Sequence, residues 1–166
     1  MLKSVTIFMR NGLEIRLAEI NDLSEWRAVA DNVAAIFDNP QMADDPEFIE
    51  YAERKLAQKE VFTAVDESGK CIGFIGFSRN FNRITWFGIH ENYRGRGIGS
   101  KLLKLALNEL DASKEITVDT FRDNHALGKP ALDFYLKHGF VLVDNTIYDN
   151  LGNERCKLAI QPGLHI

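Results

Sequence analysis

Residues 93–100 read Tyr-Arg-Gly-Arg-Gly-Ile-Gly-Ser, and they are the residue types in this chain best suited to binding an anion. They follow an apolar run at 84–89 and lead into an amphipathic run at 98–110, an order that predicts strand, glycine-rich turn and helix. The first turn of a helix carries unpaired N–H donors and about half a positive charge, which suits a pyrophosphate. Arg94 and Arg96 add two permanent cations. The stretch therefore predicts a cradle for a phosphate-bearing ligand.

Two familiar phosphate-binding patterns fit this stretch poorly. A P-loop ends in Gly-Lys-Ser/Thr, whereas the order here is Gly99, Ser100, Lys101. A dinucleotide fingerprint, Gly-x-Gly-x-x-Gly, meets Ser100 in place of its third glycine, although Glu115 lies at the distance of its acidic residue. Expected hairpins earlier in the chain also disfavour a nucleotide-dependent oxidoreductase, because that fold is built from βαβ units.

The pattern that fits is Arg/Gln-x-x-Gly-x-Gly at residues 94–99, which resembles the acyl-CoA-binding motif of the GNAT superfamily of N-acetyltransferases. A second segment, 134–140, reads Phe-Tyr-Leu-Lys-His-Gly-Phe. It resembles the family's other signature, a helix that bears a tyrosine and ends in Gly-Phe. The two motifs occur in the family's order, and the resemblance covers roughly residues 60–145.

The resemblance implies an enzyme that transfers an acetyl group from acetyl-CoA to an amine of a small molecule or peptide by direct attack. It assigns cofactor binding to the cradle and to the end of the strand before it, where Ile89 matches the residue whose backbone binds the pantetheine arm. The cofactor-binding residues are then Ile89, Arg94, Gly95, Arg96, Gly97, Ile98, Gly99 and Ser100. Tyr135 matches the general acid that reaches the cofactor sulfur. A phenol suits this role because the reference pKa values of phenol and thiol, about 10 and 8.5, lie close together.

The general base stays open at this point. An alkylamine with a pKa near 10.4 is mostly protonated at neutral pH, so a base or a proton wire must help. The histone-acetylating branch of the family carries a glutamate near the start of the cradle strand, and this chain has Arg83 there. The remaining candidates are His90, Glu91, Asp119 and a water chain to bulk solvent.

A second departure from the family lies between the two motifs. The family commonly has a cofactor-contacting asparagine seven residues before the tyrosine, where this chain has Gly128. Asn124, four residues earlier, is the candidate substitute.

Length and composition are those of an ordinary globular protein. With 166 residues, 45% hydrophobic and 27% charged, we expect a single domain over residues 1–166. A net charge of −4 disfavours nucleic acid as a partner, and no apolar run is long enough to span a membrane. Cys71 and Cys156 have no paired spacing and fit a reducing, cytoplasmic setting. Histidines and carboxylates show no metal-ligand spacing, so we expect no metal.

Periodicity and capping signals predict the elements that position these residues. Asp22 and Glu25 have capping-box spacing, and Asp45 with Pro46 marks a second helix start. We expect helices at 22–37, 45–59, 98–110 and 131–138, and strands at 13–17, 61–65, 71–77, 84–89, 116–121, 140–143 and 155–160. This order predicts an α/β (α+β) fold with a mixed, mostly antiparallel central sheet of about seven strands and helices on both faces. The GNAT resemblance implies the same architecture.

In the family, N-terminal helices, here at about 18–60, shape the acceptor site, and a core at about 84–145 binds acyl-CoA. The loop at 38–45 is acidic. The aromatic residues near it in sequence are Trp26, Phe37, Phe48 and Tyr51. An acidic, aromatic mouth predicts a cationic acceptor such as a polyamine, an amino sugar or a peptide N-terminus, steered by Asp38 and Asp44.

An alternative class is a non-catalytic acyl-CoA-binding sensor or regulatory domain. Such a protein would keep residues 94–100 but would have no need of Tyr135, so the retained tyrosine favours the enzyme. Dimers are frequent in the family, and a homodimer stays open.

Overall fold

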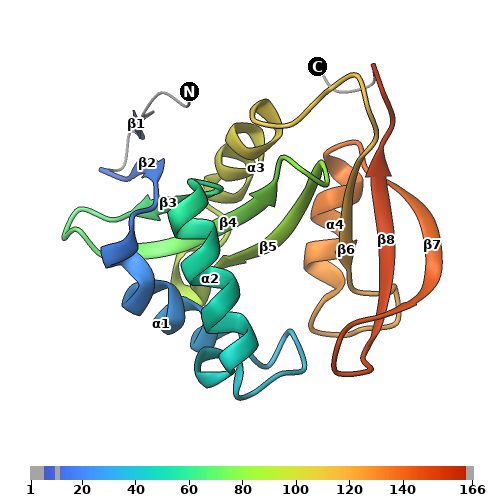
Figure 1. Cartoon of the computed structure of the whole chain (residues 1–166), viewed down its shortest axis with the longest axis horizontal. Coiled ribbons are helices and arrows are strands. Elements are labelled where there is room, and N and C mark those ends of the chain that lie inside the picture. Colours follow the sequence, from blue (N-terminus) through green and yellow to red (C-terminus); the bar gives the residue numbers. More distant parts are fainter. Residues whose placement is uncertain (1–5, 10–11, 164–166) are drawn as a thin grey trace.

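In the computed structural model, which describes residues 6–9 and 12–163, these residues form an eight-stranded sheet with helices on both faces (Figure 1). The strands are β1 Thr6–Phe8, β2 Glu14–Leu17, β3 Val61–Val65, β4 Cys71–Ser78, β5 Arg83–Ile89, β6 Ile116–Thr120, β7 Val141–Tyr148 and β8 Glu154–Ile160. The helices are α1 Leu23–Val33, α2 Pro46–Gln58, α3 Ile98–Asn108 and α4 Lys129–Lys137. Short 3-10 helices occupy Ile20–Asp22, Met42–Asp44 and Glu91–Tyr93.

The strand order is β1-β2-β3-β4-β5-β6-β8-β7, and every neighbouring pair is antiparallel except β5 and β6. The predicted mixed, mostly antiparallel sheet is therefore confirmed. It has one strand more than the seven expected, because the short β1 pairs with β2 at the edge of the sheet.

Two apolar cores lie on opposite faces of the sheet. One forms beneath α3 and α4, where Ile98, Leu102, Ala106 and Leu110 are all buried, as their four-residue spacing predicts. The other forms beneath α1 and α2, where the ring of Trp26 stacks on Phe74 with centroids 5.1 Å apart. Figure 1 shows the two helix pairs on either side of the sheet.

Strands β5 and β6 separate soon after they meet. They pair only at Arg83 with Thr117 and at Ile84 with Val118. Immediately beyond, the register of β5 against β4 shifts, which leaves Thr85 without a residue opposite it. A bulge of this kind bends a strand and increases its twist, so it directs β5 away from β6. The divergence opens the sheet between the two strands, and Figure 1 shows α4 in the gap between their ribbons.

The start of α1 differs from the prediction. The expected capping box of Asp22 and Glu25 is wrong, because the Asp22 side chain makes no cap hydrogen bond to this helix. Its carboxylate instead accepts two hydrogen bonds from Arg16, at 2.8 and 3.1 Å, and one from the Glu19 N–H. The Glu25 carboxylate accepts from the Cys71 N–H at 2.6 Å. The half-buried Arg16 and the backbone N–H of Cys71 thus bind the two carboxylates that the capping-box pattern assigned to the start of α1.

Other boundaries shift for similar reasons. Helix α1 ends at Val33 rather than near Phe37, and turns follow it. Helix α2 begins as expected, with the Asp45 carboxylate accepting from the Glu47 N–H at 3.0 Å. Strand β7 runs to Tyr148, beyond the predicted 140–143, because two register shifts let it continue along β8. Within the described residues, no helix combines the length and the apolar composition that crossing a membrane requires.

Candidate functional site

The glycine-rich turn between β5 and α3 depends on two left-handed residues. Gly95 and Gly97 have φ angles of 77° and 79°, a region that L side chains enter only with strain. A Cβ atom at either position would meet no heavy atom within 4 Å, so backbone conformation rather than space requires glycine. Gly97 is the N-cap of α3, and the turn therefore presents the start of this helix at the end of β5.

The first turn of α3 is held close to β5 and α4. A Cβ atom on Gly99 would lie 3.4 Å from Ile89 Cδ1 and 3.4 Å from Phe134 Cε1, so the helix approaches both neighbours tightly. The Lys101 N–H is bonded to the Gly97 carbonyl at 3.3 Å, whereas the N–H groups before it have no earlier helical carbonyl to bond. These donors and the helix dipole would suit an anion at this turn, as the sequence predicts.

The backbone of Ile89 is turned towards the opening in the sheet. The next residue, His90, bonds through its N–H to the Ile72 carbonyl on β4 at 2.8 Å. Because backbone groups alternate direction along a strand, the N–H and carbonyl of Ile89 face the opposite edge. The Arg94 Nε donates to that carbonyl at 3.1 Å and so anchors the turn to the end of the strand.

A cavity of about 510 Å³ runs from the cradle to the end of α1. Of the predicted site residues, it is lined by Ile89, Arg94, Gly95, Gly97, Gly99, Ser100 and Tyr135. Arg96 and Ile98 do not line it. The guanidinium of Arg96 lies 5.2 Å from the centre of the Tyr93 ring, and the Ile98 side chain is buried in the core. Only the backbone of Ile98 is therefore left to contact a ligand in the cavity.

Tyr135 lies on α4, 5% exposed, where its ring packs edge-on against Phe87, Phe134 and Phe140. Burial raises the pKa of its hydroxyl well above the ordinary value. The phenol therefore keeps its proton at neutral pH, and Tyr135 is one of the residues that line the cavity.

A second cavity of about 60 Å³ adjoins the first between β5 and β6, and Tyr135 borders both. Asp119 lines this smaller cavity, and its carboxylate is paired with Arg83 at 2.9 Å. Of the other candidate bases, Glu91 is exposed, and the His90 ring nitrogen Nδ1 accepts from the Asn92 N–H at 3.2 Å. Among the described residues proposed as bases, only Asp119 borders a cavity that reaches Tyr135.

The segment between β6 and α4 explains the missing asparagine. A Cβ atom on Gly128 would overlap the ring of Phe121, so no side chain fits there while Phe121 keeps its place. Asn124 is exposed and is not among the residues that line either cavity. His125 takes the local polar role, because its Nδ1 accepts from the Gly128 N–H at 2.8 Å.

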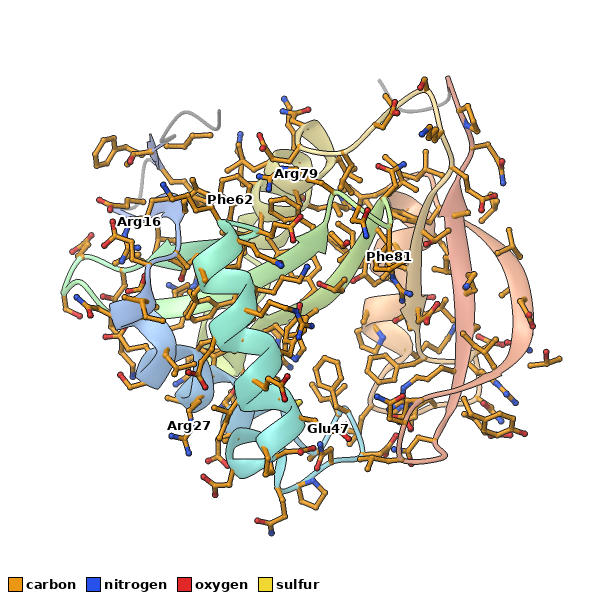
Figure 2. All side chains as sticks on the ribbon, viewed as in Figure 1. Arg16, Arg27, Glu47, Phe62, Arg79 and Phe81 are labelled. Atoms are coloured by element: carbon orange, nitrogen blue, oxygen red, sulfur yellow. The ribbon has the colours of Figure 1, made fainter. Side chains whose placement is uncertain are left out.

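The acidic loop does not provide the free carboxylates that the sequence suggested. Asp38 pairs with His125 at 2.8 Å and with Arg155 at 3.2 Å. Asp44 pairs at 2.8 Å with Arg27, which Figure 2 labels on α1. The predicted steering of a cation by Asp38 and Asp44 therefore has no support, because each carboxylate already has a cationic partner.

Several lining residues were not assigned from sequence. They are mostly apolar and come from α1, β5, α4 and the segments beside them: Val33, Ile36, Phe87, Gly88, Phe121, Leu127, Pro130, Ala131, Phe134 and Lys137. Of the four aromatic residues expected at the acceptor mouth, Phe37 lines the cavity. The other three do not line it and pack in the core beneath α1 and α2: Trp26, Phe48 and Tyr51. In the sequence, the i, i+3, i+4 spacing of Val33, Ile36 and Phe37 indicated that these three side chains share one face. The second motif contained Phe134 and Lys137, on the same helix as Tyr135.

The chain matches the family described as the acetyltransferase (GNAT) domain over residues 57–142, more than half of its length. This match includes the cradle and Tyr135. The protein therefore belongs to the GNAT family of acetyltransferases. No sequence among curated proteins matches it.

Solved structures show the same fold. A putative phosphinothricin N-acetyltransferase is 25% identical, with a TM-score of 0.65 over 90% of this chain and 98% of that one. An N-acetyltransferase from Thermoplasma acidophilum in complex with coenzyme A is 20% identical, with a TM-score of 0.60 and the same coverage. A putative acetyltransferase from Salmonella typhimurium, with its cofactor acetyl-CoA, is 16% identical, with a TM-score of 0.66 over 93% of this chain and 96% of that one.

Proposed function

We propose that this protein is an acetyl-CoA-dependent N-acetyltransferase that acts on an amine by direct attack. The observation that carries the proposal is a single cavity lined both by the glycine-rich start of α3 and by the buried Tyr135. Cofactor and acid thus share one space, as a transfer from a thioester requires. The proposal treats the chain as one domain, with the acceptor site in residues 18–60 and the cofactor core in residues 84–145.

Coenzyme A would be held by backbone and cationic groups. The N–H groups of the first turn of α3 suit its pyrophosphate, and Arg94 and Lys137 are charged side chains that line the same cavity. The outward-facing backbone of Ile89 suits the amide groups of the pantetheine arm, as an added strand would. Coenzyme A or acetyl-CoA in two of the similar structures supports this choice of cofactor.

The proposed reaction needs no covalent enzyme intermediate. The lone pair of the neutral amine attacks the thioester carbonyl carbon, a C–N bond forms, and the carbonyl oxygen briefly carries the negative charge. The C–S bond then breaks, its electron pair leaves with the sulfur, and Tyr135 donates its proton to the thiolate. The nitrogen loses its extra proton to water or to Asp119, and the phenolate of Tyr135 is reprotonated from solvent.

Tyr135→Phe tests the assigned acid, because it removes one hydroxyl and keeps the ring packing. We expect kcat to fall by about 10²- to 10⁴-fold, the usual contribution of general acid–base catalysis, while the Kd for coenzyme A stays the same. Tyr148→Phe is the matched control, since Tyr148 is 61% exposed on β7 and lines neither cavity. Turnover that survives in Tyr135→Phe would remove Tyr135 from the mechanism.

Thermal unfolding with acetyl-CoA, free coenzyme A, ATP and NAD tests the cofactor separately. A ligand at a hundred times its Kd adds about 2.7 kcal/mol to the stability of the folded state. We expect both coenzyme A species to raise Tm and neither nucleotide to do so. Binding of acetyl-CoA without transfer to any amine would instead favour the non-catalytic sensor. Cys71 and Cys156, both buried and free, fit the reducing cytoplasm in which the proposal places the reaction.

A further inference from the structure

The end of the larger cavity that lies away from the cradle is apolar. It is lined by Val33 at the end of α1, by Ile36 and Phe37 in the turns that follow, and by Phe121 and Leu127 in the segment between β6 and α4. The Phe37 ring stacks on Trp86 with centroids 5.7 Å apart and meets Phe121 edge-on at 5.5 Å. Among the described lining residues, the charged side chains are Arg94 and Lys137, and Arg94 belongs to the cradle turn.

The charged groups around this apolar end are already neutralised. The smaller cavity beside it is bordered by Asp119 and Arg155, and each has a partner of opposite charge. Asp119 pairs with Arg83 at 2.9 Å, and Arg155 pairs with Asp38 at 3.2 Å. A second positive charge on an acceptor would therefore lose its water without gaining a free carboxylate, which disfavours a polyamine.

A bridge of hydrogen bonds closes this end of the site. The Arg155 guanidinium on β8 donates to the Phe37 carbonyl at 2.8 Å and to the Asp38 carboxylate at 3.2 Å. Asn153 in the β7–β8 turn donates to the Asp38 carbonyl at 3.5 Å. Figure 1 shows the light-blue loop after α1 approaching this turn across the opening of the sheet. An extended peptide that continued past this end of the site would have to displace the bridge.

We infer that the acceptor is a small primary amine on an aryl or branched aliphatic body, an inference that rests on the proposed acetyl transfer. The body of such an amine fills the apolar end, and the amino group lies near Tyr135 and the thioester. Transfer from water into an apolar cavity also favours the neutral form of an amine, which is the form that attacks. The apolar lining that binds the hydrocarbon part of the acceptor thus also favours the neutral amino group that attacks the thioester.

A panel of acceptors tests the inference directly. Initial rates of coenzyme A release are measured with acetyl-CoA and, in turn, phenethylamine, isoamylamine, spermidine, glucosamine and an alanine-initiated tripeptide. We expect kcat/KM for phenethylamine and isoamylamine to exceed those of the other three by about tenfold or more, the discrimination that apolar pockets achieve. A higher kcat/KM for spermidine, glucosamine or the tripeptide overturns the inference and leaves the proposed acetyl transfer standing.

Leu127→Asp provides a variant with an opposite effect on two acceptors. Leu127 is 59% exposed at the rim, so an aspartate there should fold and should place an unpaired carboxylate beside the apolar end. We expect kcat/KM to fall about tenfold or more for phenethylamine and to rise for spermidine. Phe81→Asp is the control, because Phe81 is 74% exposed at the turn between β4 and β5, where Figure 2 labels it. The turn that carries Phe81 and the glycine-rich turn lie at opposite ends of β5, so this substitution adds a negative charge away from the cavity.

A binding measurement separates failure of the inference from failure of the proposed function. Phenethylamine and spermidine are titrated by calorimetry into the protein saturated with free coenzyme A. Binding of phenethylamine in preference to spermidine supports the inference. Preference for spermidine, or coenzyme A binding with no phenethylamine binding, overturns it. Absence of coenzyme A binding would refute the proposed function, and the inference would fall with it.

Discussion

The hydroxyl of Ser100 lies 3.0 Å from Nε2 of His138, so a hydrogen bond joins the first turn of α3 to the end of α4. The other ring nitrogen, Nδ1, lies 2.8 Å from the Phe134 carbonyl oxygen. A carbonyl can only accept, so in the neutral ring Nδ1 carries the proton and Nε2 accepts from Ser100. The Ser100 proton is thereby directed to the histidine, and the backbone N–H groups of α3 are left as the donors for an anion.

A double-mutant cycle with Ser100→Ala and His138→Ala measures this link. We expect each single variant to lower the free energy of unfolding, and the coupling between them to be about 0.5–1.5 kcal/mol, the net value of one hydrogen bond. Urea unfolding at pH 7.5 gives all four values. Single effects that add to within about 0.3 kcal/mol would show that the two side chains are not coupled.

Gly97→Ala tests the left-handed cap of α3. The alanine must adopt a φ of 79° or rearrange the turn. We therefore expect the free energy of unfolding to fall by about 1–2 kcal/mol and the Kd for coenzyme A to rise. Gly152→Ala is a matched control, because Gly152 has a φ of 84° and also has no atom within 4 Å of its Cβ position. It lies in the β7–β8 turn, so it should lose similar stability and keep its affinity. Equal affinities in the two variants would contradict the cradle.

Restoring the family's asparagine should harm this protein. In Gly128→Asn the new Cβ would overlap the Phe121 ring, and we expect overpacking to cost about 1–3 kcal/mol or more. Differential scanning calorimetry would show the lower Tm. The double variant Phe121→Ala with Gly128→Asn removes the obstructing ring, and it should be less destabilised than the two single effects added together. Simple additivity would mean that Phe121 is not the obstacle.

Stability should decline at alkaline pH. Burial raises the pKa of the Tyr51 and Tyr135 hydroxyls and of the Cys71 thiol above their ordinary values. The folded chain therefore holds these protons after the unfolded chain has lost them, so stability is full at neutral pH and falls as pH rises above about 9. Above pH 10, each of the two tyrosines lowers the free energy of unfolding by about 1.4 kcal/mol for every further pH unit, until the folded-state pKa is reached. Urea unfolding from pH 7 to 11 should show a shallower decline for Tyr135→Phe, and an identical decline would contradict the role of its burial.

Local rules in the sequence were enough to predict the glycine-rich turn before α3 and most of the elements around it. Gly95 and Gly97 occupy positive φ angles that favour glycine, and a helix follows them immediately. Asp45 caps α2 as its spacing with Pro46 indicated. These features depend on residues a few positions away in the sequence, so they can be predicted without knowing how the rest of the chain folds.

Long-range contacts decided the remainder of the site. Glu25 seemed free to complete the capping box of α1, but its carboxylate accepts from the Cys71 N–H, 46 positions away on β4. Asp38 seemed free to attract a cation, but Arg155, 117 positions away, neutralises it and fastens the loop after α1. An ion pair of this kind depends on which strands lie side by side, and charge patterns along the chain carry no such information.

The sequence by itself determined that this protein has a GNAT fold with a glycine-rich turn before α3 and a tyrosine on α4. The tertiary structure decided what surrounds them. A bulge at Thr85 separates β5 from β6, and the cavity at this opening is lined by Phe37 after α1 and by Phe121 and Leu127 from the segment between β6 and α4. The physical reason is that glycine conformation and helix capping are local, whereas the lining and charge of a cavity arise from residues that only the folded chain brings together.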